Sequence, residues 1–139
     1  MSLIKVVEPG GLIAILGGGQ LGRMTAMAAR TMGYRVRVMD PEAACPASFV
    51  VDEVVVGKWD DVGAARRLAT GADAVTLEIE QIGIDALREV AARAPLRPGV
   101  EAIPFVPRAF PARPYPSLLP SPASPGAETS TMSMGSTSP

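Results

Sequence analysis

Apolar residues along the first hundred positions alternate between short unbroken runs and stretches of helical spacing. Four short runs rich in valine, leucine, isoleucine or alanine have the length of strands. The first is unbroken, which is typical of a strand buried on both faces, and the second alternates. These runs occupy residues 12–16, 35–39, 53–56 and 74–77. Helical spacing in the intervening and following segments predicts three helices. They cover residues 20–32, residues from an aspartate cap at 60 or 61 through 70, and residues 84–91. The pattern is therefore that of an α/β protein.

The order of these elements predicts a Rossmann-like, doubly wound parallel sheet with right-handed crossovers and the strand order 3-2-1-4. Arg97 could begin a fifth strand, but Pro98 leaves it no length. This topology sets the carboxyl ends of strands 12–16 and 74–77 side by side, at the crevice where such sheets bind ligands.

The first helix is expected to pack on the sheet through one apolar face. Leu21, Met24 and Ala28 follow one another at helical spacing and are predicted to form that buried face. Gly33 stands where a glycine commonly terminates a helix.

Composition changes near residue 104. Residues 1–103 hold five prolines and two serines, whereas residues 104–139 hold nine prolines and seven serines. Proline at this density prevents helix formation, and too little apolar surface recurs to offset the entropy of ordering. We predict one domain over residues 1–103 and a disordered Pro/Ser/Ala-rich tail over residues 104–139. The PxxP spacing at 111–114 leaves open a Pro-rich ligand for a partner protein.

Charge and residue usage exclude several function classes. A formal net charge of −1 argues against nucleic acid or an anionic membrane surface as a partner. The absence of histidine removes the usual general base, the usual zinc ligand and every Ser-His or Cys-His nucleophile pair, and no metal site is expected. No catalytic residue is assigned. Cys45, the single cysteine, is expected to be inert. No run approaches the roughly 18 apolar residues of a membrane helix, so the expected location is the cytoplasm, away from membranes.

A glycine-rich turn joins the first strand to the first helix. Gly17, Gly19 and Gly22 fit G-x-G-x-x-G, and Gly18 lies within the motif. The first glycine permits the tight turn, the second admits a ligand, and the third allows close packing of helix on strand. Free amides at the helix N-terminus favour a phosphate, so Gly17, Gly18 and Gly22 form a predicted phosphate loop. The alternative is a turn that only connects two elements.

Acidic residues follow two of the predicted strands. Asp40 ends the second strand, where a dinucleotide enzyme holds ribose hydroxyls and where an aspartate also commonly stabilises a turn. Glu78 and Glu80 follow the fourth strand and are expected on one side of the chain, near the crevice. Their charge suits a hydroxyl or amine of a ligand and repels its phosphate. A solvated acidic loop is the alternative.

Two further side chains near these motifs have less defined roles. Arg23 could pair with a phosphate or lie across the surface. Trp59 is expected to cover the sheet edge and not to stack on a base.

Three segments together resemble a known enzyme family. They are IAILGGGQLGRM at 13–24, VMDP at 38–41 and VTLEIE at 75–80. They resemble the N-terminal pre-ATP-grasp domain of N5-carboxyaminoimidazole ribonucleotide synthase, the ATPase subunit of phosphoribosylaminoimidazole carboxylase in the ATP-grasp superfamily. The resemblance runs from about residue 11 to residue 103.

The resemblance implies a role in de novo purine synthesis. Family members are ATP-dependent carboxylating enzymes, of the ligase or lyase class, that act on aminoimidazole ribonucleotide with ATP, bicarbonate and magnesium. By this similarity Gln20, Leu21 and Glu78 would touch the ribonucleotide, with Gly19 beside them. Asp40 would be structural, and the domain would bind no dinucleotide.

The resemblance ends near residue 103, before the ATP-grasp domains that supply the family's ATP, magnesium and further substrate contacts. We hypothesise that a frameshift or gene-model error produced the tail. The chain alone is expected to be inactive, to bind neither ATP nor magnesium tightly, and to bind aminoimidazole ribonucleotide weakly. Family members are often dimeric, and the chain is expected to self-associate.

Two other function classes remain open from the residues. An NAD-binding module of an oxidoreductase is favoured by Gly17, Gly19, Gly22 and Asp40 together. A non-catalytic interaction protein would use the Pro-rich tail to recruit its partner.

Overall fold

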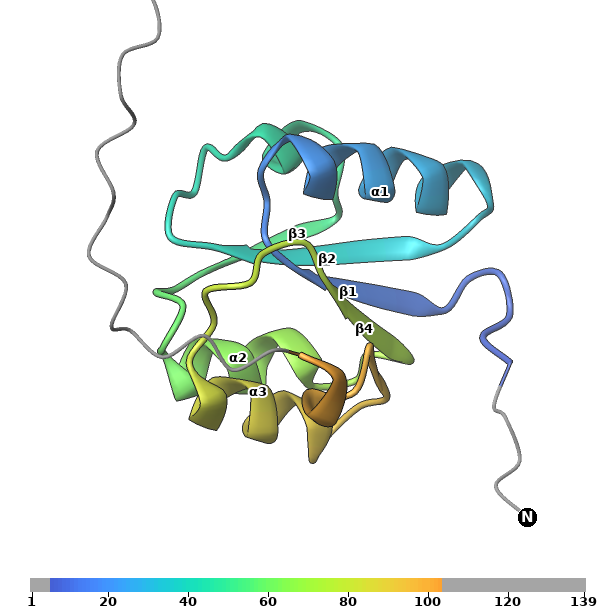
Figure 1. The fold of residues 1–139 in the computed structure, drawn as a ribbon. Helices are drawn as coiled ribbons and strands as arrows, with labels where there is room; N and C mark the ends of the chain where they lie inside the picture. Colours follow the sequence, from blue (N-terminus) through green and yellow to red (C-terminus); the bar gives the residue numbers. More distant parts are fainter. Residues whose placement is uncertain (1–5, 104–139) are drawn as a thin grey trace, which may run out of the picture. The chain divides into compact units, whose positions relative to one another are not determined.

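A computed structural model describes residues 6–103 of the chain, and the predicted tail, with its expected disorder, lies outside the described residues. Within them the chain forms a five-stranded, all-parallel sheet of order β3-β2-β1-β4-β5 (Figure 1). The strands are β1 (Leu12–Leu16), β2 (Arg35–Asp40), β3 (Glu53–Val56), β4 (Ala74–Leu77) and β5 (Leu96–Arg97). The α/β class and the predicted order of the first four strands are confirmed.

The fifth strand corrects the prediction that Pro98 leaves no strand at Arg97. β5 is two residues long and pairs with β4 through Val75 opposite Leu96 and Thr76 opposite Arg97. Leu96 is buried in the core, so apolar burial draws this short segment to the sheet edge before the proline.

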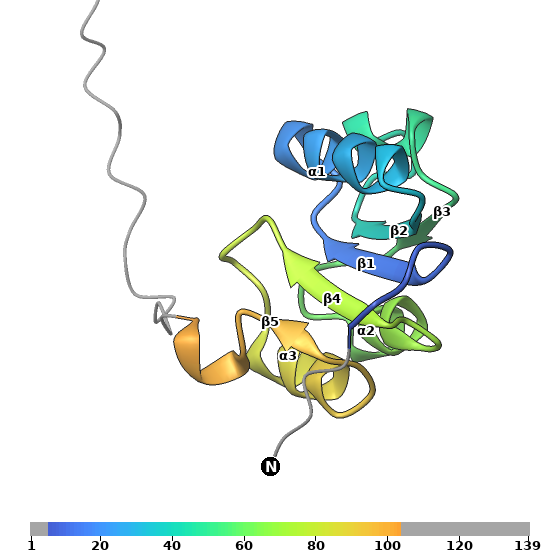
Figure 2. The same cartoon turned by 90° about the vertical axis from the view of Figure 1, so that its right-hand side faces the viewer.

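Helices cover both faces of the sheet. They are α1 (Gln20–Thr31), α2 (Val62–Ala69) and α3 (Ile84–Ala91), with short 3-10 turns at Pro46–Phe49 and Val100–Ala102. Figures 1 and 2 show α1 on one face of the sheet and α2 and α3 on the other. Asp61 caps α2 by accepting a hydrogen bond from the Ala64 amide at 2.9 Å. No helix within residues 6–103 has the length and apolar character needed to cross a membrane.

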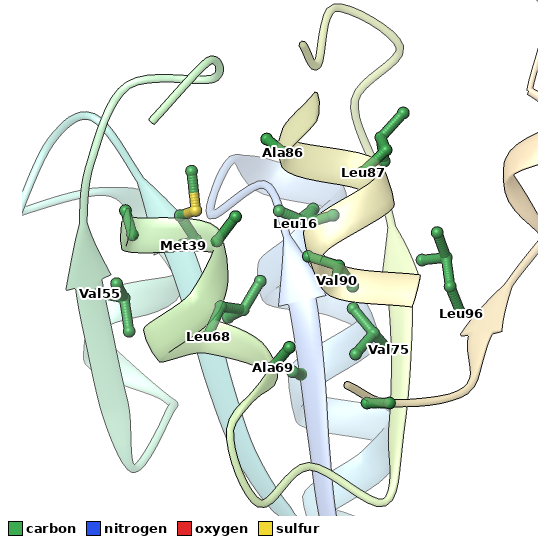
Figure 3. Packing of buried hydrophobic residues seen from close by; sticks show 14 residues of the cluster. Leu16, Met39, Val55, Leu68, Ala69, Val75, Ala86, Leu87, Val90 and Leu96 are labelled. Carbon is green, nitrogen blue, oxygen red and sulfur yellow. The ribbon is translucent and has the colours of Figure 1, made fainter. Parts of the chain in front are cut away.

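Two apolar cores lie on the two faces of the sheet. The core beneath α2 and α3 contains Leu16, Leu68 and Val90, which pack together in Figure 3. The core beneath α1 contains Ile15 and Val38. Neighbouring residues of a strand point to opposite faces, so a central strand that is covered on both sides buries apolar residues at successive positions. This requirement explains the unbroken apolar run of β1.

The face of α1 that packs on the sheet is not the predicted one. Leu21 and Met24 are 61% and 58% exposed, and Ala28 is exposed as well. The helix instead buries its smallest residues: Gly22, Ala26 and Ala29. Small side chains let the helix backbone approach the sheet closely, whereas leucine and methionine would hold it away. The prediction counted apolar character and missed the requirement for small size.

Arg37 joins β2 to the end of α2. Its guanidinium donates hydrogen bonds to the carbonyl oxygens of Arg67, Leu68 and Thr70 at 3.1, 3.0 and 2.8 Å. Its Nε also pairs with Glu53 at 2.6 Å. These carbonyls lie at the helix C-terminus, where they lack helical donors and carry partial negative charge. The arginine therefore stabilises the position of α2 on the sheet.

We expect Arg37→Met to lower the free energy of unfolding by about 1–3 kcal/mol, because it removes several charge-assisted hydrogen bonds and keeps the apolar stem. Urea denaturation followed by circular dichroism measures the effect. Arg66→Met is the matched control, since the Arg66 side chain, which pairs with Glu89 at 2.8 Å, is 56% exposed and the pair should be worth less than about 1 kcal/mol. Equal losses in the two variants would contradict the capping role of Arg37.

Candidate functional site

A cleft opens where β1 and β4 end. Leu16 and Leu77 are paired at the last register position of these strands, and the chain leaves them at Gly17 and Glu78. The cleft has a volume of about 340 Å³. Its lining residues are Gly17, Gly19, Gln20, Leu21, Gly22, Asp40, Trp59, Glu78 and Ile79. The structure thus brings every residue of the predicted site except Gly18 to one cleft, at the end of the sheet where parallel sheets bind ligands.

Three glycines of the turn differ in what surrounds them. Gly17 has φ of 114°, and a Cβ there would lie 2.5 Å from the Ile79 side chain. A Cβ at Gly22 would collide with the Gly17 carbonyl oxygen. Gly19 has extended backbone and nothing within 4 Å of the position its Cβ would take. Gly17 and Gly22 are therefore required by the fold, whereas Gly19 borders open space.

Gly18 points away from the cleft, contrary to its place in the predicted phosphate loop. Its amide donates to Asp40 Oδ2 at 3.0 Å, and its carbonyl accepts from the Ala47 amide at 2.8 Å. A Cβ at Gly18 would lie 2.5 Å from Cys45 Sγ. The Gly18 amide is occupied by a carboxylate and so is not available to a phosphate.

Asp40 holds the turns beside the cleft. In addition to the Gly18 amide on Oδ2, its Oδ1 accepts a hydrogen bond from the Glu42 amide at 2.9 Å. Both carboxylate oxygens are thus bonded to backbone amides, which gives Asp40 a structural role. Burial, together with the negative charge of Asp40, raises the pKa of the neighbouring Cys45 thiol. A buried thiol that resists ionisation is a poor nucleophile, in keeping with the inert cysteine expected from the sequence.

Glu78 is the acidic side chain that projects into the cleft without a backbone partner among the described residues. It is half-buried, and its Oε1 accepts a hydrogen bond of 2.7 Å from the Thr25 hydroxyl on α1. Sequence analysis missed Thr25, because no local pattern indicates a partner 53 positions away. Glu80 is exposed and does not line the cleft. The expected alternation fails there because β4 ends at Leu77.

Trp59 lies in the cleft wall, which sequence reasoning did not foresee. Its half-buried side chain packs against the core beneath α2 and α3 and also borders the cleft. Arg23 is half-buried and is absent from the lining. Arg23 therefore supplies no positive charge to the cleft lining.

The cleft suits a ligand that donates hydrogen bonds to its carboxylates and accepts hydrogen bonds from its backbone amides. Asp40 and Glu78 contribute carboxylates, and no lysine or arginine belongs to the lining formed by the described residues. The first amides of α1, at Gln20, Leu21 and Gly22, have no acceptor within the helix and carry its positive dipole end. Both carboxylate oxygens of Asp40 are bonded to backbone amides, and the described lining has no lysine or arginine to hold a triphosphate. These residues therefore do not fit ATP with magnesium.

A larger open groove of about 500 Å³ lies between α3 and β5, lined by Arg93, Leu96 and Glu101 among others. Its lining contains none of the glycine-turn residues and neither Asp40 nor Glu78. Size alone does not make it the better candidate, because the smaller cleft holds the motif glycines and Glu78.

Comparison with known proteins identifies relatives of the domain. The family model for the ribonucleotide synthetase preATP-grasp domain matches residues 11–106. N5-carboxyaminoimidazole ribonucleotide synthase of Brucella melitensis is 40% identical over 97 residues, which are 70% of this chain and 27% of the relative. The chain thus spans about a quarter of the length of the curated relatives it matches.

Solved structures that resemble this chain come from the same enzyme family as the curated relatives. N5-carboxyaminoimidazole synthetase of Staphylococcus aureus complexed with ADP is 38% identical, with a TM-score of 0.66 over 70% of this chain and 26% of that one. The Aspergillus clavatus synthase in complex with ADP and 5-aminoimidazole ribonucleotide is 38% identical, with a TM-score of 0.62 over 68% and 25%. The family model and these relatives give no support to a nicotinamide-dependent oxidoreductase.

The glycine geometry predicts that two alanine substitutions in one turn will differ in stability. Gly22→Ala should destabilise the fold by about 1–3 kcal/mol or more, because the new methyl group meets backbone. Gly19→Ala should cost less than about 1 kcal/mol, because its backbone is extended and its Cβ enters open space. Thermal and urea unfolding of both variants measures the difference. A Gly19 variant as unstable as the Gly22 variant would contradict the described turn.

Proposed function

The chain belongs to the ribonucleotide synthetase preATP-grasp domain family, and from that membership we propose that its cleft binds aminoimidazole ribonucleotide. The observation that carries the proposal is the joint presence, in one cleft, of the open amide end of α1 and the carboxylate of Glu78. A relative solved in complex with the same ribonucleotide supports the choice of ligand.

The chemistry of the cleft suggests how the ligand would lie. Aminoimidazole ribonucleotide carries a phosphate, ribose hydroxyls and an amine. Glu78 accepts hydrogen bonds and repels anions, so we place a hydroxyl or the amine at this carboxylate. The amides of Gln20 and Leu21 suit an acceptor atom of the ligand. Gly19, which has no Cβ, leaves room for the ligand against the backbone.

The cleft supplies only part of what this ligand needs. No lysine or arginine in the described lining balances the phosphate, so the affinity of these residues for the ribonucleotide should be low. In the proposed function the remaining contacts come from the part of the relatives outside the matched segment, which is 27% of the length of one of them. Because the cleft provides only some of the ligand contacts, we expect it to bind the ribonucleotide weakly.

For the longer protein we propose the carboxylation of aminoimidazole ribonucleotide with ATP and bicarbonate, a step of purine synthesis. The support is the shared name of the curated relatives and the solved structures of relatives complexed with ADP or ATP. ATP and magnesium are not assigned to the cleft described above, because its residues do not fit them.

Two substitutions test the ribonucleotide site. Gly19→Ala should abolish binding of aminoimidazole ribonucleotide to the 139-residue chain, because a methyl group would occupy ligand space. Glu78→Gln should weaken it by roughly 10- to 100-fold, as expected for loss of a charge-assisted hydrogen bond of about 1.5–3 kcal/mol. Isothermal titration calorimetry measures both.

Glu80→Gln is the matched control for Glu78→Gln, because Glu80 is exposed, carries the same charge two positions away and lies outside the cleft lining. It should bind like the parent. If the Gly19 and Glu78 variants also bind like the parent, the ribonucleotide does not lie in this cleft.

A second test concerns catalysis by the chain alone. The 139-residue protein should release no phosphate from ATP above background, with or without aminoimidazole ribonucleotide, because its cleft offers no cation for a triphosphate. A phosphate-release assay on a purified preparation measures this. Ribonucleotide-stimulated release would show that the catalytic groups lie within this chain.

A further inference from the structure

Thr25 makes a hydrogen bond that its position in a helix does not demand. Threonine hydroxyls in helices commonly bond to the carbonyl four residues earlier. Two threonines of this protein do so: Thr31 donates to the Met27 carbonyl at 2.9 Å, and Thr70 donates to the Arg66 carbonyl at 2.7 Å. Thr25 donates instead to Glu78 Oε1 at 2.7 Å, across 53 positions of sequence.

The surroundings of Thr25 make this choice informative. The residues of α1 buried against the sheet are glycine and alanine, at Gly22, Ala26 and Ala29. Thr25 is half-buried on the same helix, and threonine is a poorer helix former than alanine. The hydroxyl therefore adds a polar group beside a small-residue interface, and its compensating contact is the carboxylate of Glu78.

The bond links the two sides of the cleft. α1 supplies the open amides of the glycine turn, and the segment after β4 supplies Glu78. A free glutamate side chain samples many rotamers, and a hydrogen bond to a charged acceptor restricts them. With Oε1 bonded to Thr25, Oε2 has no hydrogen-bond donor within residues 6–103 and is left for a ligand.

We infer that Thr25 is a positioning residue, which holds the Glu78 carboxylate so that its second oxygen accepts a hydrogen bond from a hydroxyl or amine of the bound ribonucleotide. The inference rests on the proposed function. Thr25 acts through Glu78 and needs no contact of its own with the ligand.

The experiment compares three variants of the full chain. Thr25→Val keeps the shape of the side chain and removes the hydroxyl, and should weaken binding of aminoimidazole ribonucleotide about tenfold. Thr25→Ser restores a hydroxyl at this position and should bind within about twofold of the parent. Thr31→Val is the matched control, because it removes a hydroxyl of the same helix that bonds only to its own backbone. Its affinity should not change.

A double-mutant cycle separates positioning from a general effect on the fold. If Thr25 acts through Glu78, then Thr25→Val should have little further effect on binding in a Glu78→Ala background, which has no acceptor for the Thr25 hydroxyl. A loss in that background as large as in the parent would overturn the inference, because Thr25 would then act by another route. Circular dichroism and thermal unfolding confirm that the compared variants are folded.

A measurement without ligand keeps this inference distinct from the proposed function. In carboxyl-detected NMR of the unliganded protein, the Glu78 side-chain signal should shift in Thr25→Val, return in Thr25→Ser and stay in place in Thr31→Val. An unmoved signal overturns the inference even if the parent binds the ribonucleotide. If the signal moves but the parent binds no ribonucleotide, the proposed function fails, and with it the role of Thr25 in that binding.

Discussion

The close approach of α1 to the end of β1 is the constraint on which the rest of the structure depends. No room for a side chain exists between Gly22 and the carbonyl oxygen of Gly17, and the helix continues the contact through Ala26 and Ala29. This approach points the amide end of α1 into the cleft at the carboxyl edge of the sheet. It also brings the Thr25 hydroxyl within hydrogen-bond distance of Glu78. A larger residue at position 22 would move α1, which would shift its amide end in the cleft and separate Thr25 from Glu78.

The same constraint explains an unusual surface. Because the inner face of α1 is reserved for small residues, its larger apolar side chains lie outside. Leu21, Met24 and Met27 on α1, and Met32 just after it, are each at least half exposed. Exposed apolar groups of this kind favour association. Self-association of the chain stays a prediction. Leu21 belongs at once to this surface and to the cleft lining.

The two carboxylates of the cleft differ in their hydrogen bonds. Asp40 uses both carboxylate oxygens on backbone amides, one of them that of Gly18. Within residues 6–103, Glu78 is held through one oxygen only. The G-x-G-x-x-G turn and the aspartate after β2 therefore look like a dinucleotide site in sequence, yet here they stabilise the turns around a carboxylate. This difference favours a small ribonucleotide donor group at Glu78 over a dinucleotide pyrophosphate.

The sequence by itself determined the first four strands, their parallel order and the meeting of the glycine turn with Glu78, because buried parallel strands and strand–turn–helix joints leave local patterns. Only the tertiary structure decided which face of α1 is buried, that Gly18 turns inward, that Trp59 borders the cleft and Glu80 does not, and that Thr25 holds Glu78. Those features depend on the space between elements and on partners distant in the chain. Apolar periodicity records that a residue avoids water, but it does not record how much room its neighbour leaves or which distant donor lies within reach.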